Sequence, residues 1–65
     1  MKLNRNKILL LCAKEQITLI ELAKRAGLSY GTLSACVNGR TTTNRTLHKL
    51  SKYFNVEIEE LVEGI

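Results

Sequence analysis

The apolar residues of this 65-residue chain recur at spacings of three and four, as in helices that each bury one face. No alternation of apolar and polar residues lasts long enough to predict a strand, and the sequence contains no proline. The pattern therefore predicts an all-α fold with one small core. The residues expected in this core are Ile8, Leu11, Cys12, Leu22, Ala23, Ala26, Leu33, Cys36, Val37, Leu47, Leu50, Phe54 and Leu61.

A repeated start signal predicts where the helices begin. An apolar residue precedes a capping position, and a second apolar residue follows five positions after the first, which is the spacing of a hydrophobic staple. The caps in these staples are Asn4, Thr18, Ser29 and Glu57, of which Glu57 is a poor one. Glu21 completes a capping box with Thr18, and Thr43 can cap one more helix without a staple.

The expected helix ends agree with these starts. Gly27, Gly39 and Asn55 each follow a helical segment and suit the left-handed residue that often ends a helix. Together the signals predict five short helices near residues 4–15, 18–26, 29–38, 43–54 and 57–63.

The length and the cysteine content restrict the possible classes of protein. A chain of this length is expected to form a single domain, residues 1–65. Cys12 and Cys36 are too few for a disulfide framework, lack zinc-ligand spacing and lie within predicted helices, so we interpret them as core thiols. No apolar run is long enough to cross a bilayer, and "MKLNRNKILLLCA" is too short and charge-bounded for a signal peptide. We expect a soluble, cytoplasmic protein that needs no cofactor, metal or small-molecule ligand.

The charged residues are distributed unevenly along the chain. Six cations and no acid lie between Leu22 and Val56, whereas four of the six acids fall within the last nine residues. This polarity predicts a protein that approaches a polyanion with one face.

The second and third predicted helices are joined by "AGLS", which is too short for an antiparallel pair without a sharp turn. Ala23 is small where the two helices cross, and Gly27 permits a positive φ in the turn. Leu28, Leu33 and Cys36 pack the third helix against the second. The spacing indicates a helix-turn-helix.

"ITLIELAKRAGLSYGTLSACVNGR", with one helix before it and "TLHKLSKYFNVEIEELV" after it, resembles the lambda-repressor/Cro-like DNA-binding domain over nearly the whole chain. The core "AGLSYGTLS..VNGR" is also similar to the lactose-repressor family headpiece, but the extra leading helix favours the phage-repressor architecture. The resemblance implies a compact five-helix fold whose second and third helices form the motif, usually acting as a dimer on double-stranded operator DNA.

Two positions depart from the phage-repressor pattern. Many family members have a buried arginine and glutamate pair where this chain has Cys12 and Val37. Replacing both partners with apolar groups can be neutral or stabilising, so the paired change supports the resemblance. The second departure is Leu19, which stands where the family often has a phosphate-binding glutamine.

The resemblance also implies which residues of the third helix face DNA. Tyr30, Gly31 and Ala35 match the principal base-reading positions, and Ser34 lies beside them. None is a long, forked donor or acceptor, so we expect modest base specificity that relies on Tyr30, on close approach and on DNA shape. An alternative remains open in which Gly31 and Ala35 are spacers and only Tyr30 and Ser34 touch DNA.

Contacts to the DNA backbone are expected mainly from the segment after the reading helix. The predicted backbone-contacting residues are Thr18, Thr32, Arg40, Thr41, Thr42, Thr43, Asn44 and Arg45. Lys24, Arg25 and Lys49 lie on helix faces, where cations are usually solvated, so they are weaker candidates for contacts to the DNA backbone. His48 has no ligand partner at metal-binding spacing and is expected at the surface.

The end of the chain is where this family commonly pairs. The predicted dimer interface comprises Val56, Ile58, Leu61, Val62 and Ile65. Leu10 and Ile20 fall outside the core pattern and are either single exposed residues or part of a partner surface.

The sequence thus predicts a sequence-specific DNA-binding transcription regulator of the phage-repressor type, acting as a repressor by occupancy. The alternative is a protein-interaction module that uses the same fold, as the scarcity of long polar residues on the reading helix suggests. The six-cation stretch without acids argues against this alternative. An enzyme is not expected, because the sequence has no nucleophile with a base, no paired carboxylates and no metal-ligand spacing.

Overall fold

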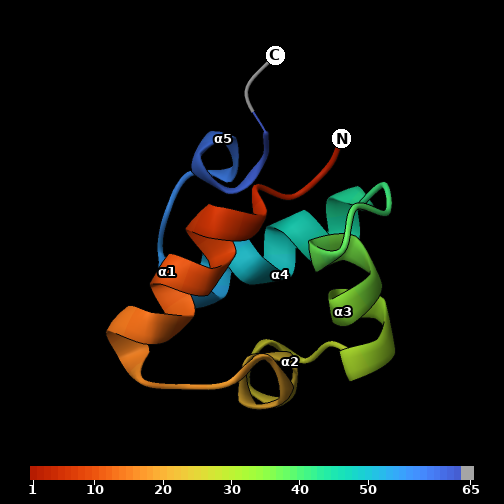
Figure 1. Ribbon diagram of the computed structural model, residues 1–65. Helices are drawn as coiled ribbons and strands as arrows, with labels where there is room; N and C mark the ends of the chain where they lie inside the picture. The colour runs from red at the N-terminus through yellow and green to blue at the C-terminus, as the bar shows by residue number, and fades with distance from the viewer. Residues whose placement is uncertain (64–65) are drawn as a thin grey trace.

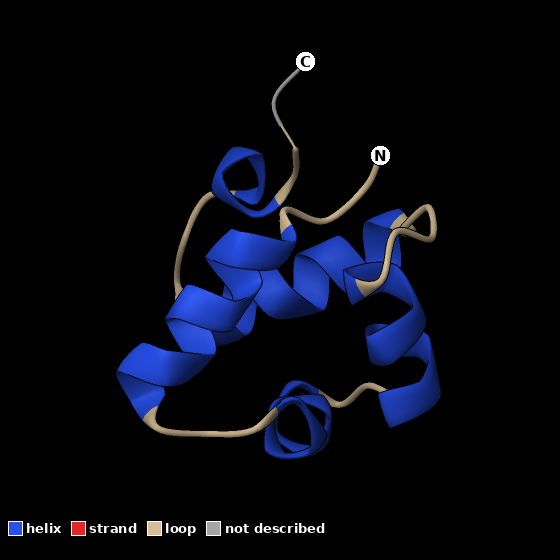
Figure 2. Cartoon of the chain, viewed as in Figure 1, coloured by secondary structure: helices blue, strands red, loops and turns tan. Residues whose placement is uncertain are grey.

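Five helices make up the computed structural model, which describes residues 1–63 (Figure 1). They are α1 (Arg5–Glu15), α2 (Leu19–Ala26), α3 (Tyr30–Val37), α4 (Asn44–Phe54) and α5 (Ile58–Leu61). Short loops join them, and no strand occurs within the described residues (Figure 2). The predicted all-α fold with five helices is confirmed.

Side-chain caps fix the starts of the first four helices. Asn4, Thr18, Ser29 and Thr43 each accept a hydrogen bond from the backbone N–H three residues later, at 3.1, 3.2, 3.2 and 3.3 Å. Because these bonds satisfy N–H groups that have no partner inside a helix, four short polar side chains are enough to place four helix starts.

The acidic residues at the starts of α2 and α5 make different contacts. Glu21 pairs with Arg25 at 3.5 Å, so the capping box at Thr18 forms only through the threonine. The weak cap at Glu57 is supported by Glu60, whose side chain accepts a hydrogen bond from the Glu57 N–H at 3.1 Å.

Three of the helix ends follow the sequence signals, and two do not. Gly27, Gly39 and Asn55 have positive φ, as predicted for residues that end helices. Gln16 ends α1 with φ 57° although no sequence signal marked it. The last helix ends at Leu61 rather than near residue 63, because Val62 is extended and its backbone pairs with that of Leu3.

The helices pack around a single apolar cluster. α2 contacts α3 and α4, while α5 contacts α4 and α1, and α3 lies along one side of the molecule (Figure 1). The buried cluster contains Leu3, Ile8, Cys12, Leu22, Ala23, Leu33, Cys36, Val37, Leu47, Leu50 and Leu61. Leu11, Ala26 and Phe54 are half-buried against it, and Leu3 joins it although the core pattern did not include that residue.

Cys12 and Val37 are both buried in this cluster, at the positions where the resemblance implies a family ion pair. Burial, and secondarily the charge of Glu15, raises the pKa of the Cys12 thiol above its ordinary value. The thiol therefore stays neutral and behaves as a small apolar side chain.

Candidate nucleic-acid interface

The turn between α2 and α3 is held by main-chain bonds and by one lysine of α4. The Leu28 N–H donates to the Ala23 carbonyl at 2.8 Å, and the Gly27 N–H donates to the Lys24 carbonyl at 3.3 Å. The Lys49 ammonium donates to the Gly27 carbonyl at 2.9 Å. This hydrogen bond ties the turn to α4 and gives Lys49 a positioning role that the sequence did not reveal.

The two faces of α3 differ sharply in burial. Leu33, Cys36 and Val37 are buried against the core and fix the orientation of the helix. At about 100° of rotation per residue, positions 30, 31, 34 and 35 share the opposite face. Tyr30 is 47% exposed on this face.

The outward face of α3, which consists of Tyr30, Gly31, Ser34 and Ala35, carries no charge. Gly31 is exposed, and a Cβ atom built there would meet nothing within 4 Å, so the space beyond it is open to an approaching partner. Ser34 and Ala35 are half-buried, and the Ser34 hydroxyl accepts a hydrogen bond from the Asn38 amide at 3.4 Å. The face offers two hydroxyl groups, one aromatic ring and a close approach to the backbone.

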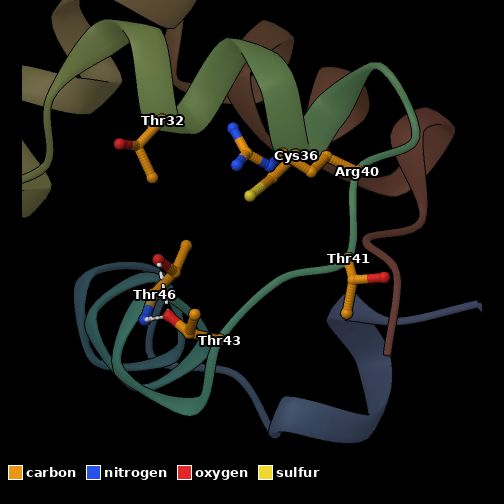
Figure 3. Close-up of a pocket in the computed structure, with 6 residues that line it drawn as sticks. All are labelled: Thr32, Cys36, Arg40, Thr41, Thr43 and Thr46. Carbon is orange, nitrogen blue, oxygen red and sulfur yellow. Dashed lines mark hydrogen bonds between the residues drawn. The ribbon is translucent and has the colours of Figure 1, made fainter.

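A hollow of about 290 Å³ lies between α3 and the start of α4 (Figure 3). The residues that line it are Thr32, Cys36, Arg40, Thr41, Thr43 and Thr46. A neighbouring hollow shares Thr32, Thr43 and Thr46 and adds Arg45 and Lys49 among its lining residues. We call the two together the α3–α4 groove.

Figure 3 shows Thr32 pointing from α3 toward Thr46 on α4, with Arg40 extending along α3. The Thr43 hydroxyl caps α4 and donates to the Thr46 hydroxyl at 3.2 Å. The groove therefore ends at the N-terminus of an 11-residue helix, where N–H groups and the helix dipole favour an anion.

Arg40 and Arg45, two cations of the groove, are free to bind an external anion. Within residues 1–63 the one salt bridge joins Arg25 to Glu21, on the surface of α2. The exposed guanidinium groups of Arg40 and Arg45 thus have no carboxylate within bonding distance in this part of the chain. Their charge is uncompensated and remains available to phosphate groups.

A family model described as the Cro/C1-type HTH DNA-binding domain matches residues 7–65. The chain belongs to this family. A search of curated proteins and a search of solved structures each gave no match. Membership of the Cro/C1-type family supports DNA as a partner of this domain.

Not every predicted backbone contact of this Cro/C1-type domain lies in the groove. Thr32, Arg40, Thr41, Thr43 and Arg45 line it. Asn44 is exposed in the first turn of α4 without lining either hollow, and Thr18 lies apart at the start of α2.

The side chain of Thr42, a predicted contact to the DNA backbone, is buried. This side chain is only 7% exposed, and its hydroxyl donates to the Thr43 carbonyl at 3.4 Å. The Thr42 N–H donates to the Met1 carbonyl at 2.7 Å. Pairing with the N-terminal segment turns Thr42 inward. No local sequence signal predicts this contact, because Met1 and Thr42 are far apart in the sequence.

The residues of the predicted dimer interface differ in burial. Leu61 has no exposed surface, because it completes the core of its own chain. Val56, Ile58 and Val62 are half-buried against that core, and Ile65 lies outside the described residues. Leu10 and Ile20, which the core pattern omitted, are about half exposed at 50% and 51%.

No group of three potential metal-ligating side chains occurs in the described part of this Cro/C1-type domain. Among residues 1–63, no helix has the length and apolar character needed to cross a membrane.

Proposed function

We propose that this Cro/C1-type domain is a sequence-specific transcription regulator that binds an operator in double-stranded DNA and represses by occupying it. The observation that carries the proposal is the placement of the uncharged outward face of α3 directly beside the cationic α3–α4 groove. One surface suits base edges and the other suits phosphates, and α3 contributes residues to both.

The size of α3 supports its insertion into the major groove. An α-helix with its side chains is about 10–12 Å in diameter, which fits the about 12 Å width of the major groove, and the eight residues of α3 give it a length of about 12 Å. Tyr30 lies at the entering end, where its hydroxyl can reach a base or phosphate and its ring can pack on a thymine methyl. Gly31 allows close approach, while Ser34 and Ala35 follow one turn later and offer a hydroxyl and a methyl group.

Backbone contacts in this proposal come from both sides of α3. Arg40, Thr41, Asn44 and Arg45 bind one strand together with the N–H groups at the start of α4. The N-terminal end of α2, capped by Thr18, binds the other strand through its backbone. These contacts position the reading helix without contributing sequence information of their own.

We further propose that the chain acts as a homodimer, at least on DNA. Val56, Ile58 and Val62 supply the apolar surface for pairing, since they remain partly exposed at the end away from α3. A two-fold dimer places its reading helices about 34 Å apart, one turn of DNA, and so requires an operator with two symmetric half-sites.

Equilibrium binding to a duplex of random sequence, titrated with salt, tests whether the domain binds DNA. We expect the logarithm of the association constant to fall linearly with the logarithm of salt concentration, by about one unit per phosphate contact. Salt-insensitive binding, or no binding to any duplex, contradicts the proposal. The protein-interaction alternative predicts that second outcome.

A further inference from the structure

The N-terminal segment, residues 1–3, connects two distant parts of the fold through its backbone. Leu3 pairs with Val62, through hydrogen bonds from the Asn4 N–H to the Leu61 carbonyl at 2.8 Å and from the Glu63 N–H to the Lys2 carbonyl at 3.0 Å. Lys2 pairs with Thr41 on the other side of the segment. The segment is therefore held between the end of the chain and the loop that leads into α4.

Neighbouring residues of this pairing differ in burial. Leu3 is buried in the core and Thr42 is also buried, whereas Lys2 and Thr41 are both exposed. Successive side chains of an extended segment point to opposite sides, so the buried Leu3 anchors the segment and turns Lys2 outward. The anchor fixes the direction of a lysine that would otherwise lie on a free terminus.

The type of pairing brings Lys2 close to Thr41. The Thr42 N–H donates to the Met1 carbonyl at 2.7 Å. Lys2 and Thr41 are therefore a non-hydrogen-bonded pair of an antiparallel bridge. In such pairs the Cα atoms are about 4.5 Å apart and the side chains stand on the same face. Thr41 lines the α3–α4 groove, so the backbone of Lys2 lies beside the edge of that groove and its ammonium is within reach of it.

The charge on Lys2 is also uncompensated. No carboxylate of the described residues lies within salt-bridge distance of its ammonium, although Glu63 is a neighbour through the backbone. We propose that Lys2 is an additional DNA-backbone contact, which the pairing of residues 1–3 with Thr41 and Val62 holds at the edge of the α3–α4 groove. The inference rests on the proposed function, and it extends the phosphate-binding surface to a residue 38 positions before Arg40.

Two matched charge removals test the inference. Lys2→Ala and Lys14→Ala each delete one exposed lysine, but Lys14 lies in the last turn of α1, at the opposite end of that helix from the N-terminal segment (Figure 1). We expect Lys2→Ala to lower the slope of log association constant against log salt by about one unit on a random duplex. Lys14→Ala leaves the slope unchanged, and Lys2→Arg, which keeps the charge, retains the slope of the unaltered protein.

The outcomes separate this inference from the proposed function. If the unaltered protein binds duplex DNA and Lys2→Ala and Lys14→Ala give the same slope, the role of Lys2 is wrong while the DNA-binding function stands. If the unaltered protein binds no duplex, both fail. Circular dichroism of each variant establishes that the helices are intact, so a loss of slope in a folded Lys2→Ala protein supports the contact.

Discussion

The outward face of α3 and the α3–α4 groove adjoin each other but have opposite chemistry. The outward face presents Tyr30, Gly31, Ser34 and Ala35 without a charge, whereas Arg40, Arg45 and several hydroxyl groups surround the groove. In the proposed complex, the first surface distinguishes sequences through a few weak contacts and the second supplies most of the affinity. If the two surfaces have these roles, affinity and specificity depend on different residues and can be altered separately.

The largest expected effect comes from Leu33→Ala, which removes the support shared by both surfaces. Leu33 has no exposed area, so the substitution leaves a cavity behind α3 and lowers the free energy of unfolding by about 2–5 kcal/mol. Chemical denaturation followed by circular dichroism measures the change. Leu10→Ala is the matched control, since Leu10 is half exposed and its loss is expected to cost below about 1 kcal/mol. Equal losses for the two variants contradict the assignment of Leu33 to the core.

Removing the groove cations changes affinity without changing specificity. For the double variant Arg40→Ala and Arg45→Ala we expect weaker binding to operator and random duplexes alike, with the salt slope reduced by about two units. Fluorescence anisotropy at several salt concentrations gives both quantities. A selective loss of operator binding shows instead that one of these arginines reads bases.

Removing Tyr30 is expected to lower specificity without changing the salt dependence of binding, and the effect is smaller than that of removing the arginines. Tyr30→Ala is expected to reduce the ratio of operator to random binding about fivefold, or about 1 kcal/mol, while the salt slope stays the same. Tyr30→Phe separates the contribution of the hydroxyl from that of the ring. An unchanged ratio in Tyr30→Ala means that Tyr30 is not a base-reading residue.

The smallest expected effect is that of Lys49→Met. This variant tests whether Lys49 holds the turn between α2 and α3 or binds phosphate. Lys49→Met keeps most of the apolar stem but loses the hydrogen bond to the Gly27 carbonyl, so the free energy of unfolding falls by about 0.5–1 kcal/mol. We expect no change in the salt slope. A slope reduced by about one unit places Lys49 among the phosphate contacts instead.

Local signals in the sequence predicted most of the fold. Asn4, Thr18, Ser29 and Thr43 marked helix starts because each cap needs only a backbone N–H three residues away. The helix-turn-helix was predictable for the same reason, since the conformation at Gly27 and the burial of Leu33 depend on residues close in sequence.

The features that the sequence did not reveal depend on distant contacts. The backbone pairing of residues 1–3 with Thr41 and Val62 buries Thr42 and shortens α5, yet main-chain hydrogen bonds carry no side-chain signature. The contact from Lys49 to Gly27 spans 22 residues and has no local pattern either. The candidate site was therefore predictable where it lies on α3, and least predictable where the N-terminus meets the loop before α4.

Selection of bound sequences from a pool of random duplexes tests the central claim most directly, because it asks whether this domain recognises particular bases. We predict enrichment of one site with two symmetric half-sites, centred about 10 base pairs apart, and with only a few strongly preferred positions in each. A pool that binds without enrichment, or that is not retained at low salt, contradicts the assignment of α3 as a reading helix.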